Sequence, residues 1–312
     1  MRVVFLGTPQ FAVPSLEALA AASHEVLAVY TQPDRPKGRG GQQAASPVKN
    51  AALQLSLPVF QPERIRRPES IEHLSSLRPD VMVVVGYGQI IPQAIIDIPR
   101  YGILNVHASL LPKYRGAAPV QWAIARGEKE TGVTIMRIDA GLDTGDMLLK
   151  WKMSIGPDER APEVAARLAV AGASLLIDAL TQIEAGTAVY VPQKHEDASY
   201  APILKKENGH IDWSRSADSI YNRMRGFDPW PGAYSTFRAK TVNLIGAKPH
   251  SSQMTGPPGS LRAEKRRLFA NCGENTALEV LELQPEGKRR MSAADFLNGY
   301  GLKPDECFGG NP

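Results

Sequence analysis

The chain has 312 residues, of which 43% are hydrophobic, and it carries a formal net charge of +4. This length and composition exclude a globally disordered protein and are sufficient for two domains with separate cores. The sequence pI of about 9.0 mildly favours an anionic partner.

Short apolar runs alternate with helix-like stretches in the first half of the chain. Strands are predicted at residues 3–6, 26–30, 59–60, 81–85, 103–107, 132–138 and 147–153. Helices are predicted at residues 11–22, 48–55, 71–77 and 162–183. The run at 81–85 contains only valine and methionine, which is typical of a strand covered on both faces. This alternation predicts an α/β domain with a doubly wound, mostly parallel sheet over residues 1–188.

The periodicity is lost over residues 187–204, which contain Pro192 and Pro202. We interpret residues 189–205 as an interdomain linker. Beyond it, strand-like runs at 232–237, 241–245 and 278–283 are separated by Gly/Pro turns, with one helix at 217–224. This pattern predicts a smaller, barrel-like β domain over residues 206–312.

The two cysteines, Cys272 and Cys307, are far apart in the sequence and form no metal-binding or disulfide framework. Such cysteine usage fits a reducing cytoplasm. The first apolar run ends at Gly7 and Pro9 and is too short for a signal peptide, and we expect no later segment to span a membrane. A cytoplasmic protein that does not bind a membrane is therefore expected. We also expect it to act as a monomer.

The most informative motif begins at the end of the strand predicted at 103–107 and continues into a Pro/Gly loop. Asn105 and His107 are two positions apart, so on a strand their side chains point to the same face. An amide donor and a titratable imidazole then share one small volume, where they can stabilise an oxyanion and move protons. The pair taken alone also fits an ordinary histidine at a strand end.

Asp143 is the third residue that we assign to this volume. It lies in a glycine-flanked segment, residues 141–146, whose backbone can approach a ligand closely. A carboxylate beside His107 favours the charged imidazolium, which can stabilise an oxyanion. The alternative is that Asp143 forms only an Asx-turn, and the neighbouring Asp139 and Asp146 offer the same chemistry.

Other kinds of catalytic site are poorly supported. The six histidines are scattered without metal-ligand spacing, so no metal is expected. Ser109 lacks the G-x-S-x-G surroundings of a nucleophile, and residues 7–11 lack the G-x-G-x-x-G spacing of a dinucleotide site. Direct attack of a substrate amine on an acyl donor fits the sequence better than covalent catalysis.

Separate blocks of the sequence, in the expected order, resemble the methionyl-tRNA formyltransferase family. These blocks are residues 7–14, 105–119 and 141–146, followed by 208–213 and 228–233 in the second domain. The resemblance covers nearly the whole chain. It implies a formyltransferase-like sheet domain followed by an OB-like β-barrel.

The resemblance also implies the substrates and the site residues. The formyl donor is expected to be 10-formyltetrahydrofolate and the acceptor initiator methionyl-tRNA. Asn105, His107 and Asp143 are expected to be catalytic. The residues expected to bind the folate are Gly86, Tyr87, Gly88, Gln89, Ser109, Leu110, Leu111 and Pro112.

Basic residues indicate where RNA is expected to bind. Arg35, Lys37 and Arg39 lie in one Pro/Gly loop, and residues 206–270 hold 11 lysines and arginines against 5 acids. The loop fits a clamp on RNA phosphates, which the resemblance favours, and the second domain fits a platform for the tRNA body. Both segments also fit ordinary solvated surfaces.

Three alternative functions stay open at this point. Transfer to a small amine, such as a sugar amine, would use the same three catalytic residues. Hydrolysis of the formyl donor would use water as the nucleophile. A noncatalytic tRNA-binding module would need only the basic segments. Donor consumption with and without charged methionyl-tRNA distinguishes these functions.

Overall fold

The computed structural model describes residues 1–37, 42–251 and 256–310, with the backbone alone described at residues 36, 37, 42 and 43. The chain divides into two compact units. Unit 1 comprises Met1–Pro119, Glu130–Ser154 and Glu163–Pro202, and unit 2 comprises Val120–Lys129, Ile155–Pro162 and Ile203–Pro312. The units therefore differ from the contiguous ranges 1–188, 189–205 and 206–312 expected from the sequence.

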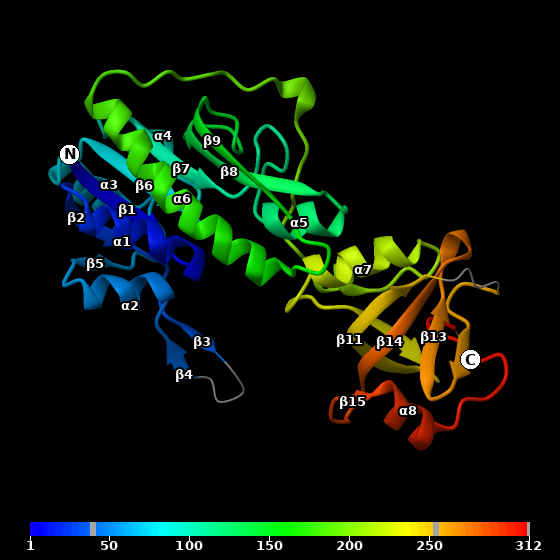
Figure 1. The fold of residues 1–312 in the computed structure, drawn as a ribbon. Coiled ribbons are helices and arrows are strands. Elements are labelled where there is room, and N and C mark those ends of the chain that lie inside the picture. The colour runs from blue at the N-terminus through cyan, green and yellow to red at the C-terminus, as the bar shows by residue number, and fades with distance from the viewer. Residues whose placement is uncertain (38–41, 252–255, 311–312) are drawn as a thin grey trace. The chain divides into compact units, whose positions relative to one another are not determined.

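Unit 1 is built on a seven-stranded sheet with the order β5-β2-β1-β6-β7-β8-β9 (Figure 1). Neighbouring strands are parallel from β5 to β7, whereas β8 and β9 are antiparallel. The predicted doubly wound, mostly parallel sheet is confirmed. The strands are β1 (Arg2–Gly7), β2 (Glu25–Tyr30), β5 (Val59–Phe60), β6 (Val81–Val85), β7 (Ile103–His107), β8 (Glu130–Arg137) and β9 (Met147–Ser154).

Helices alternate with the strands of this sheet, as the sequence pattern predicts. The α-helices are α1 (Val13–Ala21), α2 (Pro47–Gln54), α3 (Pro68–Ser76), α4 (Gln93–Ile96) and α6 (Ala161–Glu184), with short 3₁₀ turns η1 (Gln10–Ala12) and η2 (His195–Asp197). The start of α2 shows why these boundaries form. Ser46 accepts a hydrogen bond from the backbone nitrogen of Lys49, and Pro47 occupies the first turn.

The long helix α6 corrects the expectation that no segment is apolar enough to cross a membrane, because its length and composition meet that criterion. Its buried residues nevertheless recur at helical spacing and include Val164, Leu168, Leu176 and Leu180. A Cβ atom placed on Gly172 would lie 2.8 Å from Val106 of β7 and 3.4 Å from Val133 of β8. The helix backbone thus packs directly on the sheet, which makes α6 a core helix of unit 1.

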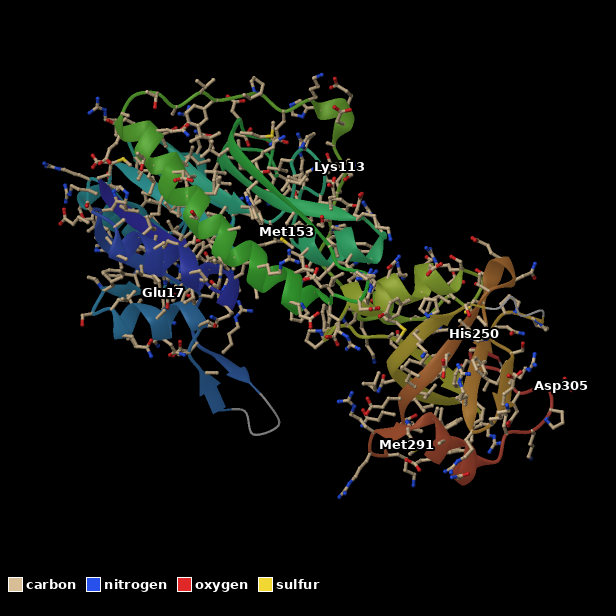
Figure 2. All side chains as sticks on the ribbon, in the orientation of Figure 1. Glu17, Lys113, Met153, His250, Met291 and Asp305 are labelled. Atoms are coloured by element: carbon tan, nitrogen blue, oxygen red, sulfur yellow. The ribbon has the colours of Figure 1, made fainter. Side chains whose placement is uncertain are left out.

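The register of β7 follows from this packing. Val106 faces α6, so its neighbours Asn105 and His107 point to the opposite face of the sheet. The loops after β1, β6 and β7 leave the same edge, because these three strands are parallel. Ligands collect at such an edge of an open α/β sheet. Lys113, labelled in Figure 2, marks the loop that follows β7.

Unit 2 is a smaller antiparallel unit, which confirms the β-rich class predicted for the C-terminal part. Its sheet has the order β10-β11-β14-β13-β12, and β15 pairs with β14. The strands are β10 (Tyr234–Phe237), β11 (Lys240–His250), β12 (Leu261–Glu264), β13 (Arg267–Asn271), β14 (Ala277–Pro285) and β15 (Met291–Ser292). The helical elements are α5 (Pro119–Ala125), η3 (Lys206–Gly209), α7 (Ala217–Gly226), η4 (Gly273–Asn275) and α8 (Ala293–Tyr300).

Candidate functional site

Asn105 and His107 lie side by side along β7, where Asn105 is partly buried and His107 is 5% exposed. The Nε2 atom of His107 is 2.9 Å from the carbonyl oxygen of Tyr114. A carbonyl only accepts, so this nitrogen carries a proton. The loop after β7 therefore fixes the orientation of the imidazole ring.

Asp143 lies next to both Asn105 and His107. Its Oδ2 atom lies 3.7 Å from His107 Nδ1, and its Oδ1 atom accepts a hydrogen bond from Asn105 Nδ2 over 3.4 Å. The backbone nitrogen of Gly116 also donates to Oδ2, at 2.8 Å. Both ring nitrogens of His107 thus face oxygen acceptors. The structure brings Asn105, His107 and Asp143 into one site.

The neighbouring acids have other surroundings. Asp139 accepts hydrogen bonds from the backbone of Gly141 and from the hydroxyl of Thr144, so it closes the turn that carries Asp143. The backbone oxygen of Asp146 accepts from Arg137 at the end of β8. The Asp143 carboxylate contacts Asn105 and His107, whereas the Asp139 carboxylate is used in the turn, so the sequence ambiguity is reduced by the geometry.

The segment after β7, residues 109–112, is fixed to β8 and β9. Thr134 donates to the carbonyl oxygen of Ser109 and accepts from the backbone nitrogen of Leu111. Lys150 donates to the carbonyl oxygen of Leu111 at 2.6 Å, and desolvation lowers the pKa of this lysine. Ser109 and Leu111 are buried, whereas Leu110 and Pro112 are partly exposed. A ligand at this segment would meet mainly backbone atoms and the two partly exposed side chains.

The loop after β6 contains the other residues expected to bind the folate. Gly86 and Gly88 are exposed and have positive φ angles of 58° and 84°, which favour glycine. Tyr87 points inward and is 1% exposed, and its carbonyl oxygen accepts from Thr8 at 2.9 Å. Gln89 accepts from the backbone nitrogen of Ile65. The two glycines therefore offer open backbone, while the other two side chains support the loop.

The predicted basic loop is only partly described. Arg35 is exposed and begins a two-stranded hairpin, β3 (Arg35–Lys37) and β4 (Gln42–Ala44), that the sequence analysis did not predict. The backbone of Lys37 pairs with Gln42 in this hairpin. Arg39 lies outside the described residues.

Two residues that the sequence analysis did not single out support the Asp143 segment. Gln193 donates from Nε2 to the carbonyl oxygens of Asp143 and Gly145, at 2.9 and 2.8 Å. Arg115 donates in turn to Oε1 of Gln193 from Nε and Nη2, at 3.0 and 2.7 Å. Gln193 belongs to the stretch predicted as a linker, where no periodic pattern marks a buried residue.

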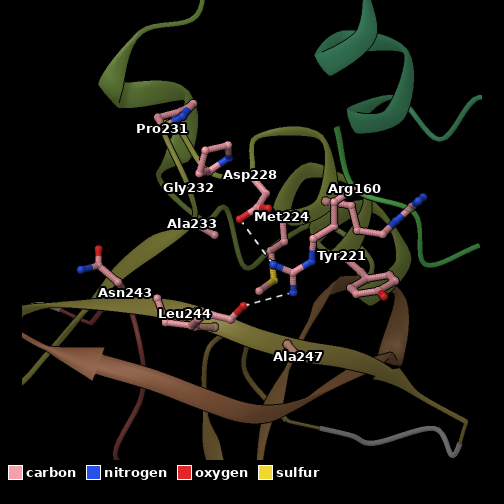
Figure 3. Close-up of a pocket in the computed structure, with 13 residues that line it drawn as sticks. Arg160, Tyr221, Met224, Asp228, Pro231, Gly232, Ala233, Asn243, Leu244 and Ala247 are labelled. Atoms are coloured by element: carbon pink, nitrogen blue, oxygen red, sulfur yellow. Dashed lines mark hydrogen bonds and ion pairs between the residues drawn. The ribbon is translucent and has the colours of Figure 1, made fainter. Parts of the chain in front are cut away.

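A cavity of about 270 Å³ lies within unit 2, between α7 and β11 (Figure 3). The Arg160 guanidinium reaches into it, where it lies 3.4 Å from the Asp228 carboxylate and donates to the carbonyl oxygen of Ile245. Pockets for small molecules are usually about 300–1,000 Å³. This cavity is slightly smaller, and its lining contains no residue that the sequence analysis assigned to catalysis or folate binding.

Comparisons with known proteins cover both units. Residues 1–180 match the family model described as formyl transferase, and residues 203–301 match its C-terminal domain. The methionyl-tRNA formyltransferase of Solibacter usitatus is 58% identical, over 99% of each chain. That of Koribacter versatilis is 57% identical, over 96% of each chain.

Solved structures share the fold at low sequence identity. A sugar 3N-formyl transferase, WlaRD, studied with dTDP and 5-N-formyl-THF, gives a TM-score of 0.67 at 18% identity and covers 93% of this chain and 99% of its own. The N-formyltransferase of Helicobacter canadensis, in complex with folinic acid and dTDP-3-aminofucose, gives a TM-score of 0.69 at 19% identity. The match covers 91% of this chain and 98% of the other. These two similarities establish the fold alone.

Proposed function

We propose, from the premise that this chain belongs to the methionyl-tRNA formyltransferase family, that it formylates the α-amino group of methionyl-initiator-tRNA. The proposed donor is 10-formyltetrahydrofolate. The product, N-formylmethionyl-tRNA, starts translation. The observation that carries formyl transfer is the convergence of Asn105, His107 and Asp143 at the end of β7, and the methionyl-tRNA acceptor rests on the similarity to the methionyl-tRNA formyltransferases.

The reaction exchanges one bond to carbon for another. A bond forms between the methionine nitrogen and the formyl carbon, and the bond from that carbon to N10 of the folate breaks. A proton leaves the amine and one is added to the folate nitrogen. The attack places negative charge on the formyl oxygen, so the site must stabilise an oxyanion and move a proton.

The three converging residues match these two tasks. We assign oxyanion stabilisation to the amide of Asn105 and to protonated His107. Asp143 keeps His107 charged across the 3.7 Å between them and helps to carry the proton from the amine. Gly116 and Tyr114 hold the carboxylate and the ring in place through their backbones.

The folate is proposed to bind between the loop after β6 and the segment after β7. The exposed backbone at Gly86 and Gly88 can donate to and accept from the edge of a pterin ring. Ile90, which is 91% exposed, offers an apolar cover for the face of that ring. Two solved structures of this fold, one determined in the presence of 5-N-formyl-THF and the other in complex with folinic acid, support a donor of this class.

The tRNA is proposed to bind through Arg35, Lys37 and Arg39 and through the exposed lysines and arginines among residues 206–270 of unit 2. These cations would contact phosphates and release counterions. A formyltransferase acting on a small amine has no need for such cations, which favours the tRNA substrate over that alternative. We propose that a single copy of the chain acts in the cytoplasm.

The direct test is to identify the products. Purified protein is incubated with 10-formyltetrahydrofolate and charged initiator tRNA, and the amino acid released from the tRNA is analysed by mass spectrometry. We expect N-formylmethionine together with an equal amount of tetrahydrofolate. Release of formate regardless of tRNA would instead identify a donor hydrolase, and no donor consumption would indicate a binding module.

A further inference from the structure

A buried arginine, Arg115, is linked through Gln193 to the proposed catalytic residue Asp143. Arg115 is 2% exposed, although arginine is rarely buried without a partner. Its guanidinium donates to Oε1 of Gln193 and lies 3.2 Å from Nδ1 of His195. In the described part of the chain, none of its hydrogen-bond acceptors is a carboxylate. The guanidinium is therefore held by an amide oxygen and a histidine nitrogen, without a carboxylate partner.

Gln193 is 6% exposed, and all the hydrogen-bonding positions of its amide are used. Oε1 accepts two hydrogen bonds from Arg115, and Nε2 donates one each to the carbonyl oxygens of Asp143 and Gly145. An arginine can only donate, so it fixes which end of the amide faces it. The amide nitrogen must then face the Asp143 segment.

Asp143 is held from two sides as a result. Its carboxylate accepts from the backbone nitrogen of Gly116, next to Arg115, and its carbonyl oxygen accepts from Gln193. Its φ angle of 51° is in the left-handed region, which non-glycine residues adopt at a cost. Such a conformation persists when its surroundings over-determine it. The two-sided contact meets that condition.

We propose that Gln193 is a positioning residue for Asp143, with Arg115 setting the orientation of its amide. This inference rests on the proposed function, because it assumes that Asp143 is catalytic. The segment that the sequence pattern marks as a linker thus becomes part of the catalytic support. A displacement of about 1 Å at a reacting group can cost about 100-fold in rate. We therefore expect the contact of Gln193 with the Asp143 segment to affect turnover rather than substrate binding.

Two substitutions of similar length separate positioning from simple burial of Arg115. Gln193→Glu keeps the oxygen that accepts both hydrogen bonds from Arg115, but it places a second oxygen, which cannot donate, opposite the carbonyl oxygens of Asp143 and Gly145. Gln193→Met removes the acceptor and the donors together. We expect both variants to lose about 10- to 100-fold in kcat, with KM for each substrate changed less than about threefold.

Hydrogen exchange gives a second readout that does not need activity. In Gln193→Glu, we expect faster amide exchange over residues 141–145 and unchanged exchange in β7. The control is Glu196→Gln, at an exposed residue of η2 in the same segment, which should match the wild type in both measurements.

Each other outcome overturns the inference. Full activity in Gln193→Glu with loss in Gln193→Met means that Gln193 serves only to satisfy Arg115. Loss in Gln193→Glu alone means that the added charge, not the lost donors, is responsible. An inactive wild-type protein would instead refute the proposed function, and the exchange measurement would still report whether Gln193 holds the segment.

Discussion

Replacing Asp143 with asparagine tests the electrostatic part of the proposed mechanism. The change keeps the size of the side chain and leaves an oxygen to accept from Gly116, but its amide nitrogen then faces Asn105 Nδ2 and the 3.4 Å hydrogen bond between the two side chains is lost. It removes the negative charge 3.7 Å from His107 Nδ1, in a place where the two side chains are 17% and 6% exposed. The expected defect therefore comes mainly from the lost charge, with a smaller part from the lost Asn105 hydrogen bond, and not from packing.

The size of the defect follows from that distance. Two unit charges at 4 Å interact by about 4 kcal/mol at an effective dielectric constant of about 20. A loss of about 1.4 kcal/mol in transition-state stabilisation costs a factor of about ten. The full charge interaction between Asp143 and His107 would thus correspond to a factor of about 10³ in rate. We expect Asp143→Asn to lower kcat by about 10²- to 10³-fold.

The assay is single-turnover formylation with enzyme in excess over methionyl-tRNA, which isolates the chemical step from product release. Asp146→Asn, a carboxylate substitution three residues along the same segment, is the matched control and should stay within about twofold of the wild type. A folded Asp143→Asn protein that transfers formyl groups at nearly the wild-type rate would refute the assigned role.

Three further outcomes are expected. Asn105→Ala should lower kcat by about 10²- to 10³-fold in the same assay, because it removes one oxyanion donor, and a change mainly in KM would contradict this role. The affinity for methionyl-tRNA, measured by filter binding, should fall steeply with salt, and Arg35→Ala should reduce the slope of log K against log salt by about 1. A slope equal to that of the wild type would remove Arg35 from the RNA contact. Glu279→Gln should lower the free energy of unfolding of unit 2 by about 1–2 kcal/mol at pH 7, because Glu279 is buried and accepts two hydrogen bonds from Arg267. The hydrogen bonds from Arg267, assisted by the charge of Lys248, hold the pKa of Glu279 below its usual value. The contribution of Glu279 to the free energy of unfolding is then complete above the ordinary glutamate pKa of about 4.3. It is lost as the pH falls through the lowered pKa of the folded state. Urea unfolding should therefore show that the difference in unfolding free energy between the variant and the wild type becomes smaller in acid. A difference that stays constant with pH would be inconsistent with this assignment.

Local patterns in the sequence were sufficient for the parts of the fold that depend on local physics. The two-residue spacing of Asn105 and His107 places them on one face of β7, and the run at Val81–Val85 is a strand buried along its whole length. The alternation of helices and strands gives the parallel sheet. These features depend on periodicity, which a single sequence displays.

Features that depend on contacts between distant residues could not be predicted in this way. Gln193 contacts Arg115 and Asp143, and no spacing in the sequence relates these three positions. The segment Val120–Lys129 belongs to unit 2, where a Cβ atom on Gly226 of α7 would lie 2.6 Å from the carbonyl oxygen of Gln121. Such close packing is decided by tertiary structure and leaves no local signal.

The central claim is that Asn105, His107 and Asp143 surround the formyl group. A crystal structure of this protein with 5-formyltetrahydrofolate tests it most directly. We predict the pterin against the backbone of Gly86 and Gly88, with the formyl group facing the three side chains and its oxygen about 3 Å from the Asn105 amide nitrogen. A folate bound in the cavity between α7 and β11, or with its formyl group facing away from all three residues, would contradict the claim.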